Sequence, residues 1–390
     1  MILENKIDSN FITFGRQEIL FLVLAIISAI GLSFGAHALL VGHDNVFGTS
    51  REIPWGILIT PYVFFACLST GLCIVCSLGQ VFNIEVFKPI INRTAFLALI
   101  TMATGLMCIT IELENPWRVP FFALLSPHPS SNIWWKTTIY SLYMIFMVFN
   151  LLSLFMKNEK RARIFAIIAL VTVTMGNLNM NSDMAILGGR GFWSENYMPL
   201  YFLSLSTLTG CAAILLFTWI ANKLNNETAS KAEDNALRAT ARLFMILLFG
   251  VLYFTGVKIM GGFSPQFTKN PEAMFLLVQG DFAPNFWIGE VFLAVVLPLL
   301  LVLITKGKNK GILAIASLSC LIGSFSLFYH LVIVGQLIPH YFQFNVVDLP
   351  KYYSYTPSLH ESMITVGAIF FFLAAFMFGE ILFKKINFGK

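Results

Sequence analysis

Long apolar runs recur along the whole chain, and they limit the possible fold more than any other feature of the sequence. Of the 390 residues, 57% are hydrophobic and only 12% are charged. Charged residues make up about a quarter of an ordinary soluble domain. An apolar run of about 18 residues or more is long enough for a helix to cross a bilayer. The sequence therefore predicts an all-α integral membrane protein with many spans.

Clusters of charge and breaks at Pro, Gly and Asn divide the chain into about ten predicted transmembrane helices. The predicted spans are 19–41, 55–80, 94–113, 133–156, 162–180, 196–222, 239–262, 282–305, 311–338 and 358–384. The run that begins at Ile19 has a charged start and the sequence Ala-His-Ala at 36–38, as a cleaved signal peptide would. We expect it to remain as the first helix.

Lysine and arginine are distributed unequally between the two sides of this arrangement. The amino terminus, the connections after the second, fourth, sixth and eighth helices, and the carboxyl terminus carry 18 of the 25. The positive-inside rule places that side in the cytoplasm, so both termini are predicted to be cytoplasmic. The same distribution accounts for the net charge of +5, and no basic patch with interleaved aromatic residues indicates binding of nucleic acid.

The connections are short, so residues 1–390 are predicted to form one membrane domain with no soluble domain attached. The segment FACLSTGLCIV in the second helix is similar to FLSLSTLTGCAAIL in the sixth. This similarity suggests two four-helix bundles, helices 2–5 and helices 6–9, with flanking helices. The first bundle would lie within 52–222, and the second, with the last helix, within 238–384. Small residues at close-packing spacing would produce the same similarity without a repeat.

The six cysteines all fall inside predicted spans. They are Cys67, Cys73, Cys76, Cys108, Cys211 and Cys320. A disulfide framework is improbable there, and we expect the cysteines to serve as small packing residues.

Polar side chains gather at the predicted outer ends of the helices, opposite the side rich in lysine and arginine. In the first half they are Tyr62, Glu112, Glu114, Arg118, His128, Lys136, Asn177, Asn179, Asp183 and Arg190, and in the second half Lys258, Glu290, His330, His360 and Glu361. A charged group in the hydrocarbon costs about 2.5 to 3.5 kcal/mol, so such residues usually face a bundle interior and serve a function. The cytoplasmic half is expected to hold little besides its Lys and Arg anchors and Glu380.

A haem site, a metal site and a transport site each fit these outer polar residues less well than a quinone site does. A b-type haem needs paired axial histidines, and no two of His37, His330 and His360 share a helix face. No histidine has a partner at metal-ligand spacing, so we expect neither haem nor metal in this chain. A secondary transporter would place its site near the midplane on broken helices. The segment TGVKIMGGFSP around Lys258 keeps a proton-coupled transporter as the alternative.

A quinone pocket needs an apolar cleft with a few hydrogen-bonding groups and a proton acceptor at the carbonyls. The outer ends of the predicted helices supply such groups: Tyr62, Glu112 or Glu114, Arg118, Asn179 and Asp183.

Several segments, taken in order, resemble the NrfD or polysulfide reductase family of membrane subunits. They are IPWGILITPYVFFACLSTG, IELENPWR, SPHPSSNIWW, GGRGFWSENYMPLYF and FWIGEVFLAVVLPLL. With ten helices and the segments ITIELENPWRVPFF and SLHESMITVGAIFF, the chain is most similar to the longer branch, which includes the HybB-type membrane subunits of hydrogenases. The resemblance spans roughly residues 52–380.

The resemblance implies a haem-free subunit of the bacterial inner membrane that binds menaquinone or ubiquinone near its outer face. It would exchange electrons with a periplasmic, ferredoxin-like subunit holding four iron-sulfur clusters. That subunit would serve a catalytic molybdopterin or nickel-iron hydrogenase subunit, so this chain would not be a catalyst by itself. Proton translocation would be a further possibility for such a subunit.

The resemblance also suggests roles for single residues. Tyr62 matches a histidine of the quinone pocket in the shorter branch, and Asn179 or Asp183 would replace a histidine or tyrosine of the fourth bundle helix. Glu112 and Asp183 are expected to exchange protons with the quinone, and Glu114 and Arg118 to complete the binding group. An ion pair with Arg118 is the alternative role for Glu112.

Two further groups complete the prediction. We expect Arg118, His128, Trp134, Trp135 and Arg190 to dock the iron-sulfur partner. Lys258, Glu290, His330 and Glu361 would form either a structural network of buried charges or a proton path. Whether Glu112 or Glu114 faces the quinone stays open, because residues two apart on a helix point to different sides.

Overall fold

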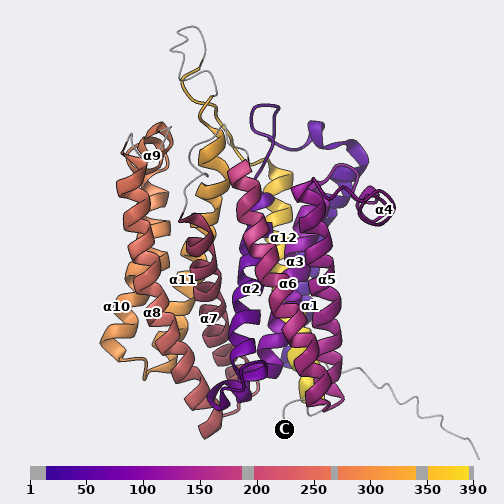
Figure 1. Ribbon diagram of the computed structural model, residues 1–390, viewed down its shortest axis with the longest axis vertical. Coiled ribbons are helices and arrows are strands. Elements are labelled where there is room, and N and C mark those ends of the chain that lie inside the picture. The colour runs from indigo at the N-terminus through magenta and orange to yellow at the C-terminus, as the bar shows by residue number, and fades with distance from the viewer. Residues whose placement is uncertain (1–14, 187–196, 265–270, 340–349, 386–390) are drawn as a thin grey trace, which may run out of the picture.

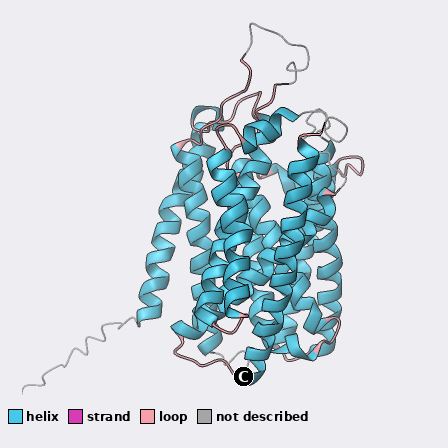
Figure 2. Cartoon of the chain, turned by 90° about the vertical axis from the view of Figure 1, so that its left-hand side faces the viewer, coloured by secondary structure: helices cyan, strands magenta, loops and turns pink. Residues whose placement is uncertain are grey.

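The computed structural model describes residues 15–186, 197–264, 271–339 and 350–385, without the side chains at 122–123, 181–186 and 385. Its α-helices are α1 (Arg16–Val41), α2 (Ile59–Gln80), α3 (Ile91–Glu112), α4 (Arg118–Leu125), α5 (Asn132–Phe155), α6 (Glu159–Ile186), α7 (Met198–Leu224), α8 (Lys231–Gly262), α9 (Pro271–Val278), α10 (Leu297–Thr305), α11 (Lys310–Ile333) and α12 (Leu359–Lys385). Three short 3₁₀ helices are η1 (His43–Asn45), η2 (Glu85–Ile90) and η5 (Val334–Gln336), and η4 (Asn285–Val296) is a π-helix. The described residues contain no strand (Figure 2).

Ten helices among the described residues are long and apolar enough to cross a membrane, and each coincides with one predicted span. Their predicted number and positions are therefore confirmed. An α-helix is stable in the hydrocarbon of a bilayer because all its backbone hydrogen bonds form within the helix. Two short helices, α4 and α9, were not predicted. Helix α8 continues through Lys258 and ends at Gly262, where the predicted span 239–262 also ends.

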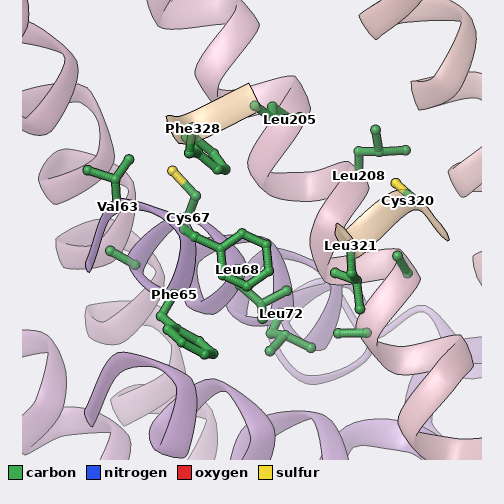
Figure 3. Packing of buried hydrophobic residues seen from close by; sticks show 14 of the residues in the cluster. Val63, Phe65, Cys67, Leu68, Leu72, Leu205, Leu208, Cys320, Leu321 and Phe328 are labelled. Atoms are coloured by element: carbon green, nitrogen blue, oxygen red, sulfur yellow. The ribbon is translucent and has the colours of Figure 1, made fainter. Parts of the chain in front are cut away.

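Helix α2 lies in the middle of the molecule, and most of its surface is covered (Figure 1). It packs against α3, α6, α7 and α11. Figure 3 shows the core at this junction, where α2 contributes Val63, Phe65, Leu68 and Leu72, α7 contributes Leu205 and Leu208, and α11 contributes Leu321 and Phe328. All six cysteines are buried and free, as predicted, and Cys67 and Cys320 are in this core.

Helices α2 and α7 cross in contact at Gly71 and Gly210. A Cβ atom on Gly71 would overlap the carbonyl group of Ser206, and one on Gly210 would overlap the backbone of Gly71. Small residues let two backbones approach this closely in a membrane. The two similar segments of the sequence are therefore the two sides of one helix crossing.

Contacts divide most of the remaining helices into two groups. Helix α2 packs against α3 and α6, and α5 packs against the same two helices. In the other group α7 packs against α8 and α11, while η4 and α10 pack between α8 and α11. Helices α1 and α12 pack against each other outside these groups, where the backbones of Gly31 and Gly367 meet.

The two ends of the helix assembly differ in their composition. We call the end where α1 begins and α12 ends the basic face, and the opposite end, which carries α4 and α9, the α4 face (Figure 1). At the basic face Asn225 accepts a hydrogen bond from Gln17 of α1 at 3.2 Å and donates one to Glu380 of α12 at 3.2 Å. The described chain therefore begins and ends at the same face.

Candidate functional site

A column of buried polar groups lies between α2, α5, α6 and α7, in the half of the molecule nearer the α4 face. Tyr62 of α2 is buried, and Gly105 of α3 allows the Tyr62 backbone to lie close to it. Asn177 of α6 is fully buried, and its amide nitrogen donates to Ser206 Oγ at 2.9 Å and to Cys67 Sγ at 3.7 Å. The Asn177 Oδ1 atom is buried without a hydrogen-bond partner. A buried carbonyl oxygen in this state is a ready acceptor for a hydroxyl group of a ligand.

The column continues toward the α4 face through Tyr140 of α5. Its ring packs against Gly176 of α6, where a Cβ atom would lie 2.5 Å from Tyr140 Cε1, and its hydroxyl donates to Met180 Sδ at 3.9 Å. Asn179 Nδ2 donates to Asn132 Oδ1 at 2.5 Å, at the start of α5. Asn179 thus joins two helix ends, while Asn177 is the amide of α6 that points into the core.

The sequence contains a pattern that distinguishes Asn177 from Asn179. The buried residues of α6 follow one stripe at three- and four-residue steps: Ala162, Ala166, Ala169, Val173, Asn177 and Met180, with the buried Gly176 beside Asn177. This is the spacing of one helix face. Asn177 lies on it and Asn179 does not, so helical periodicity alone would have favoured Asn177 over Asn179.

Glu112 and Glu114 occupy different environments at the end of α3. Glu112 is the last residue of the helix and is half-buried, whereas Glu114 and Arg118 are exposed. Within the described part of the chain no ion pair joins Glu112 to Arg118. Burial lowers the pKa of the nearby His43 imidazole, and the Glu114 and Asp44 carboxylates partly oppose this. Glu114 is therefore part of a solvated rim, and Glu112 is the carboxyl group that enters the protein.

The predicted docking residues lie around the start of α5 at the α4 face. His128 and Trp135 are exposed and Trp134 is half-buried. The two indole rings meet edge to face at 4.8 Å, and Trp135 Nε1 donates to Pro129 O at 2.8 Å. Arg190 lies outside the described residues. Asp183 belongs to helix α6, but its side chain is outside the description.

A second polar group is buried among α8, η4 and α11. Lys258 Nζ lies 2.6 Å from Glu290 Oε1, and His330 Nδ1 lies 3.2 Å from Glu290 Oε2. These three residues are 3%, 0% and 0% exposed, respectively. Lys258 Nζ also lies 5.6 Å from the centre of the Phe286 ring, and His330 Nε2 is buried without a hydrogen-bond partner. We call Lys258, Glu290 and His330 the buried triad.

Glu290 lies within the π-helix η4. Wide turns of this kind are uncommon and occur frequently at functional sites. The sequence placed all three residues of the triad in the outer parts of their helices, and the structure brings them together. The irregular helix that carries the central carboxylate was not predicted.

Glu361, the fourth residue of the predicted proton path, makes a separate set of contacts. Its carboxylate accepts hydrogen bonds from Ser358 N at 2.8 Å, Gly48 N at 2.9 Å and the Tyr355 hydroxyl at 2.7 Å. Ser358 Oγ accepts in turn from Glu361 N at 3.1 Å, which completes a capping box at the start of α12. Burial raises the pKa of Tyr355, and the Glu361 carboxylate raises it further, so the hydroxyl remains a donor.

Two histidines meet at the α4 face, although the sequence placed no two of the spanning histidines on a common helix face. His37 Nδ1 of α1 and His360 Nε2 of α12 lie 3.1 Å apart, with their rings stacked. Axial ligands on opposite sides of one metal ion at about 2 Å each would lie about 4 Å apart. The shorter distance fits a direct hydrogen bond between the rings. Among the described residues no three His, Cys, Asp or Glu side chains are grouped as a metal site.

The half nearer the basic face holds more buried polar groups than predicted. Gln80 Nε2 donates to Asn150 Oδ1 at 2.6 Å in the core, and Arg93 Nε donates to Glu380 Oε1 at 2.9 Å. Arg93 also lies 3.6 Å from Glu233. These pairs join α2 to α5, α3 to α12 and α3 to α8, and we interpret them as structural.

Three relatives match the chain over nearly its whole length. The "Hdr-like menaquinol oxidoreductase integral membrane subunit" of Archaeoglobus fulgidus is 24% identical over 379 residues, which cover 95% of each chain. A selenate reductase subunit of Mesobacillus selenatarsenatis is 25% identical over 403 residues, covering 90% of this chain and 91% of the relative. The "Probable Ni/Fe-hydrogenase 2 b-type cytochrome subunit" of Escherichia coli is 23% identical over 367 residues, covering 87% and 85%.

A family match agrees with these relatives and with the motifs in the sequence. The family described as "Polysulphide reductase, NrfD" matches residues 45–340, which include the polar column and the buried triad. The matched residues begin at the end of η1 and continue past η5. The chain is therefore an integral, multi-pass membrane protein of the NrfD, or polysulphide reductase, family.

Proposed function

We propose that the chain is the quinone-reactive membrane subunit of a respiratory oxidoreductase complex. The observation that carries this proposal is the relative named as a menaquinol oxidoreductase subunit, which aligns over 95% of this chain. The buried polar column supports it, because it offers unpartnered hydrogen-bonding capacity within an apolar core, as a quinone head group requires.

In this proposal the Tyr62 hydroxyl donates to a quinone carbonyl oxygen, and Asn177 Oδ1 accepts from a hydroxyl group of the quinol. Tyr140 lines the route from the α4 face. Glu112 takes up the protons that quinol oxidation releases, or supplies them for quinone reduction. A half-buried carboxyl group at a helix end suits this transfer, because it contacts both the protein interior and the aqueous phase. Asp183, Asn179, Glu114 and Arg118 remain proposed members of the same site.

The quinone is proposed to be menaquinone or ubiquinone, and electrons pass to iron-sulfur clusters of a partner subunit. That partner would be a periplasmic protein with four clusters, joined to a catalytic molybdopterin or hydrogenase subunit. The exposed surface of Arg118, His128 and Trp135 supports docking at the α4 face.

In the proposed topology the two helix groups are four-helix bundles, and the basic face lies on the cytoplasmic side of a bacterial inner membrane.

We also propose proton translocation as a second function of the same subunit, carried by the buried triad. The supporting observation is a Glu that contacts both a Lys and a His away from solvent, the three residues belonging to three different helices. Ionisable groups inside a membrane protein are costly and commonly serve proton or ion transfer. Glu361 is a weaker candidate for this path, because its carboxylate already accepts three hydrogen bonds.

Purification of the native complex in mild detergent tests the proposed quinone function. Mass spectrometry should identify an iron-sulfur subunit, a catalytic subunit and an extractable quinone together with this chain. A chain that purifies alone, without quinone, and that exchanges protons for a solute in proteoliposomes would instead be a proton-coupled transporter.

Reconstitution of the same complex into vesicles containing a pH indicator tests proton translocation. Quinone-linked turnover should be accompanied by proton movement across the membrane beyond that of the quinone chemistry. Glu290→Gln should remove this extra movement, while the complex that assembles keeps its quinone-linked turnover. If turnover moves no extra protons, the buried triad is structural.

A further inference from the structure

A cavity at the basic face is formed by residues of both α8 and the α10–α11 link. It has a volume of about 350 Å³ and is lined by basic and apolar side chains, among them Arg238, Arg242, Met245, Leu303, Lys306 and Lys308. A larger cavity of about 620 Å³ shares Arg238 and Lys308 as lining residues. Helices α8 and α10 lie side by side at the edge of the helix assembly (Figure 1), and both contribute residues to the smaller cavity.

Both walls of the smaller cavity change from apolar to basic in the same direction. On α8, Arg238, Arg242 and Met245 are spaced four and three residues apart and so share one helix face. They span about 10 Å along the helix, with Met245 deepest in the membrane. On the other wall, Leu303 in α10 precedes Lys306 and Lys308 at the basic face. A phospholipid has the same polarity along its axis, with an anionic phosphate above its acyl chains.

The basic residues of this cavity are largely uncompensated. The Asp234 carboxylate is already engaged by Arg238 at 2.9 Å and by Lys310 at 2.6 Å. Within the described part of the chain, Arg242, Lys306 and Lys308 have no carboxylate within 4.0 Å. Three exposed cations that converge on one cavity repel one another unless an anion joins them.

From this geometry we infer that the cavity is a binding site for an anionic phospholipid. Arg242, Lys306 and Lys308 hold the phosphate, and Met245 and Leu303 contact the upper part of an acyl chain. Basic pockets between transmembrane helices bind anionic lipid head groups in this way. The site lies at the opposite end of the molecule from the proposed quinone site and does not depend on it.

The competing explanation is that these cations only set the membrane orientation, as lysine and arginine do at many helix ends. A matched control is available on the same face, in the α5–α6 connection and the first turn of α6. Lys157, Lys160 and Arg161 are exposed, and Lys157, like Lys306, has a positive φ. Replacing all three by Gln removes the same charge without changing the cavity.

Native mass spectrometry of the purified complex, titrated with phosphatidylglycerol, separates the two explanations. The triple variant Arg242→Gln, Lys306→Gln, Lys308→Gln should bind one lipid fewer than the wild type, with affinity for that lipid reduced about a hundredfold. The control triple variant should bind as the wild type does, and phosphatidylcholine should not compete. Equal losses in both variants, or displacement of the lipid by equimolar glycerol 3-phosphate, would overturn the inference.

A second measurement needs no variant and covers the case in which the triple variant does not assemble. Wild-type complex is illuminated in vesicles containing phosphatidylglycerol with a photoreactive group near its phosphate. Labelled peptides should come mainly from 238–245 and 302–308. Labelling spread equally over these segments and 157–163 would contradict a defined site.

Discussion

Lys258 Nζ and Glu290 Oε1 lie 2.6 Å apart in the interior of a membrane protein, 32 residues apart in the sequence. Desolvating two charges costs several kcal/mol per ion, and their attraction offsets this only if both partners are present. Glu290→Gln should therefore lower the free energy of unfolding by about 3 to 5 kcal/mol. The measurement is the midpoint of thermal unfolding in detergent.

The control for this prediction replaces both partners of the pair. Lys258→Met with Glu290→Leu should recover part of the lost stability, because both charges of the ion pair are removed while the buried His330 loses its hydrogen bond to Glu290. It should not recover proton translocation. A double variant as unstable as Glu290→Gln alone would show that the ion pair itself does not account for the loss.

Glu361 provides a test that separates a structural carboxylate from a proton carrier. Glu361→Gln weakens the capping box of α12 and the contact to Gly48, and we expect a loss of about 2 to 3 kcal/mol. Proton movement per turnover should be unchanged in the variant that assembles. A stable Glu361→Gln variant that no longer moves protons would instead place Glu361 in the proton path.

Tyr62→Phe tests the proposed quinone site at the hydroxyl group that would donate to the quinone. Loss of one hydrogen bond to the quinone should raise the KM for quinol about fivefold and leave assembly intact. Tyr143→Phe is the matched control, since Tyr143 is also buried in the same helix group but its hydroxyl lies 2.9 Å from Ser69 Oγ. An equal change of KM in both variants would indicate a general effect on packing.

Glu112→Gln tests the proposed proton transfer at the α4 face. Removing a proton-transfer group should lower kcat by about a hundredfold, with the iron-sulfur partner still bound. Glu114→Gln, two residues away and exposed, should retain nearly full turnover. A loss of turnover in Glu114→Gln alone would assign proton transfer to the exposed Glu114. Unchanged turnover in both variants would show that another residue transfers the protons.

The glycine crossing of α2 and α7 predicts a sharp difference between two alanine substitutions. Gly71→Ala introduces a methyl group that overlaps the Ser206 carbonyl, so the helices must separate and the yield of monodisperse protein should fall strongly. Gly250→Ala in α8 has no atom within 4 Å and should be neutral or stabilise by up to about 1 kcal/mol. Equal yields from both variants would contradict close contact at this crossing.

Some features of the candidate site were visible in the sequence and others were not. The sequence marked Glu112 as a helix-end carboxylate and named Lys258, Glu290 and His330 as one group, and the structure places them so. It favoured Asn179 where the structure puts Asn177 in the core. It also grouped Glu361 with the buried triad, because position along a helix says nothing about the direction in which a side chain points.

The sequence by itself determined the ten spans and the family. A helix in a membrane satisfies its own backbone hydrogen bonds, so the length and apolar character of each segment suffice to predict it. The tertiary structure alone decided which polar groups meet, such as Glu361 and Gly48, which are 313 residues apart. Those meetings depend on how each helix is rotated about its axis and which helix it touches. Contacts between small residues, such as Gly71 against Gly210, set that rotation, and local sequence does not encode it.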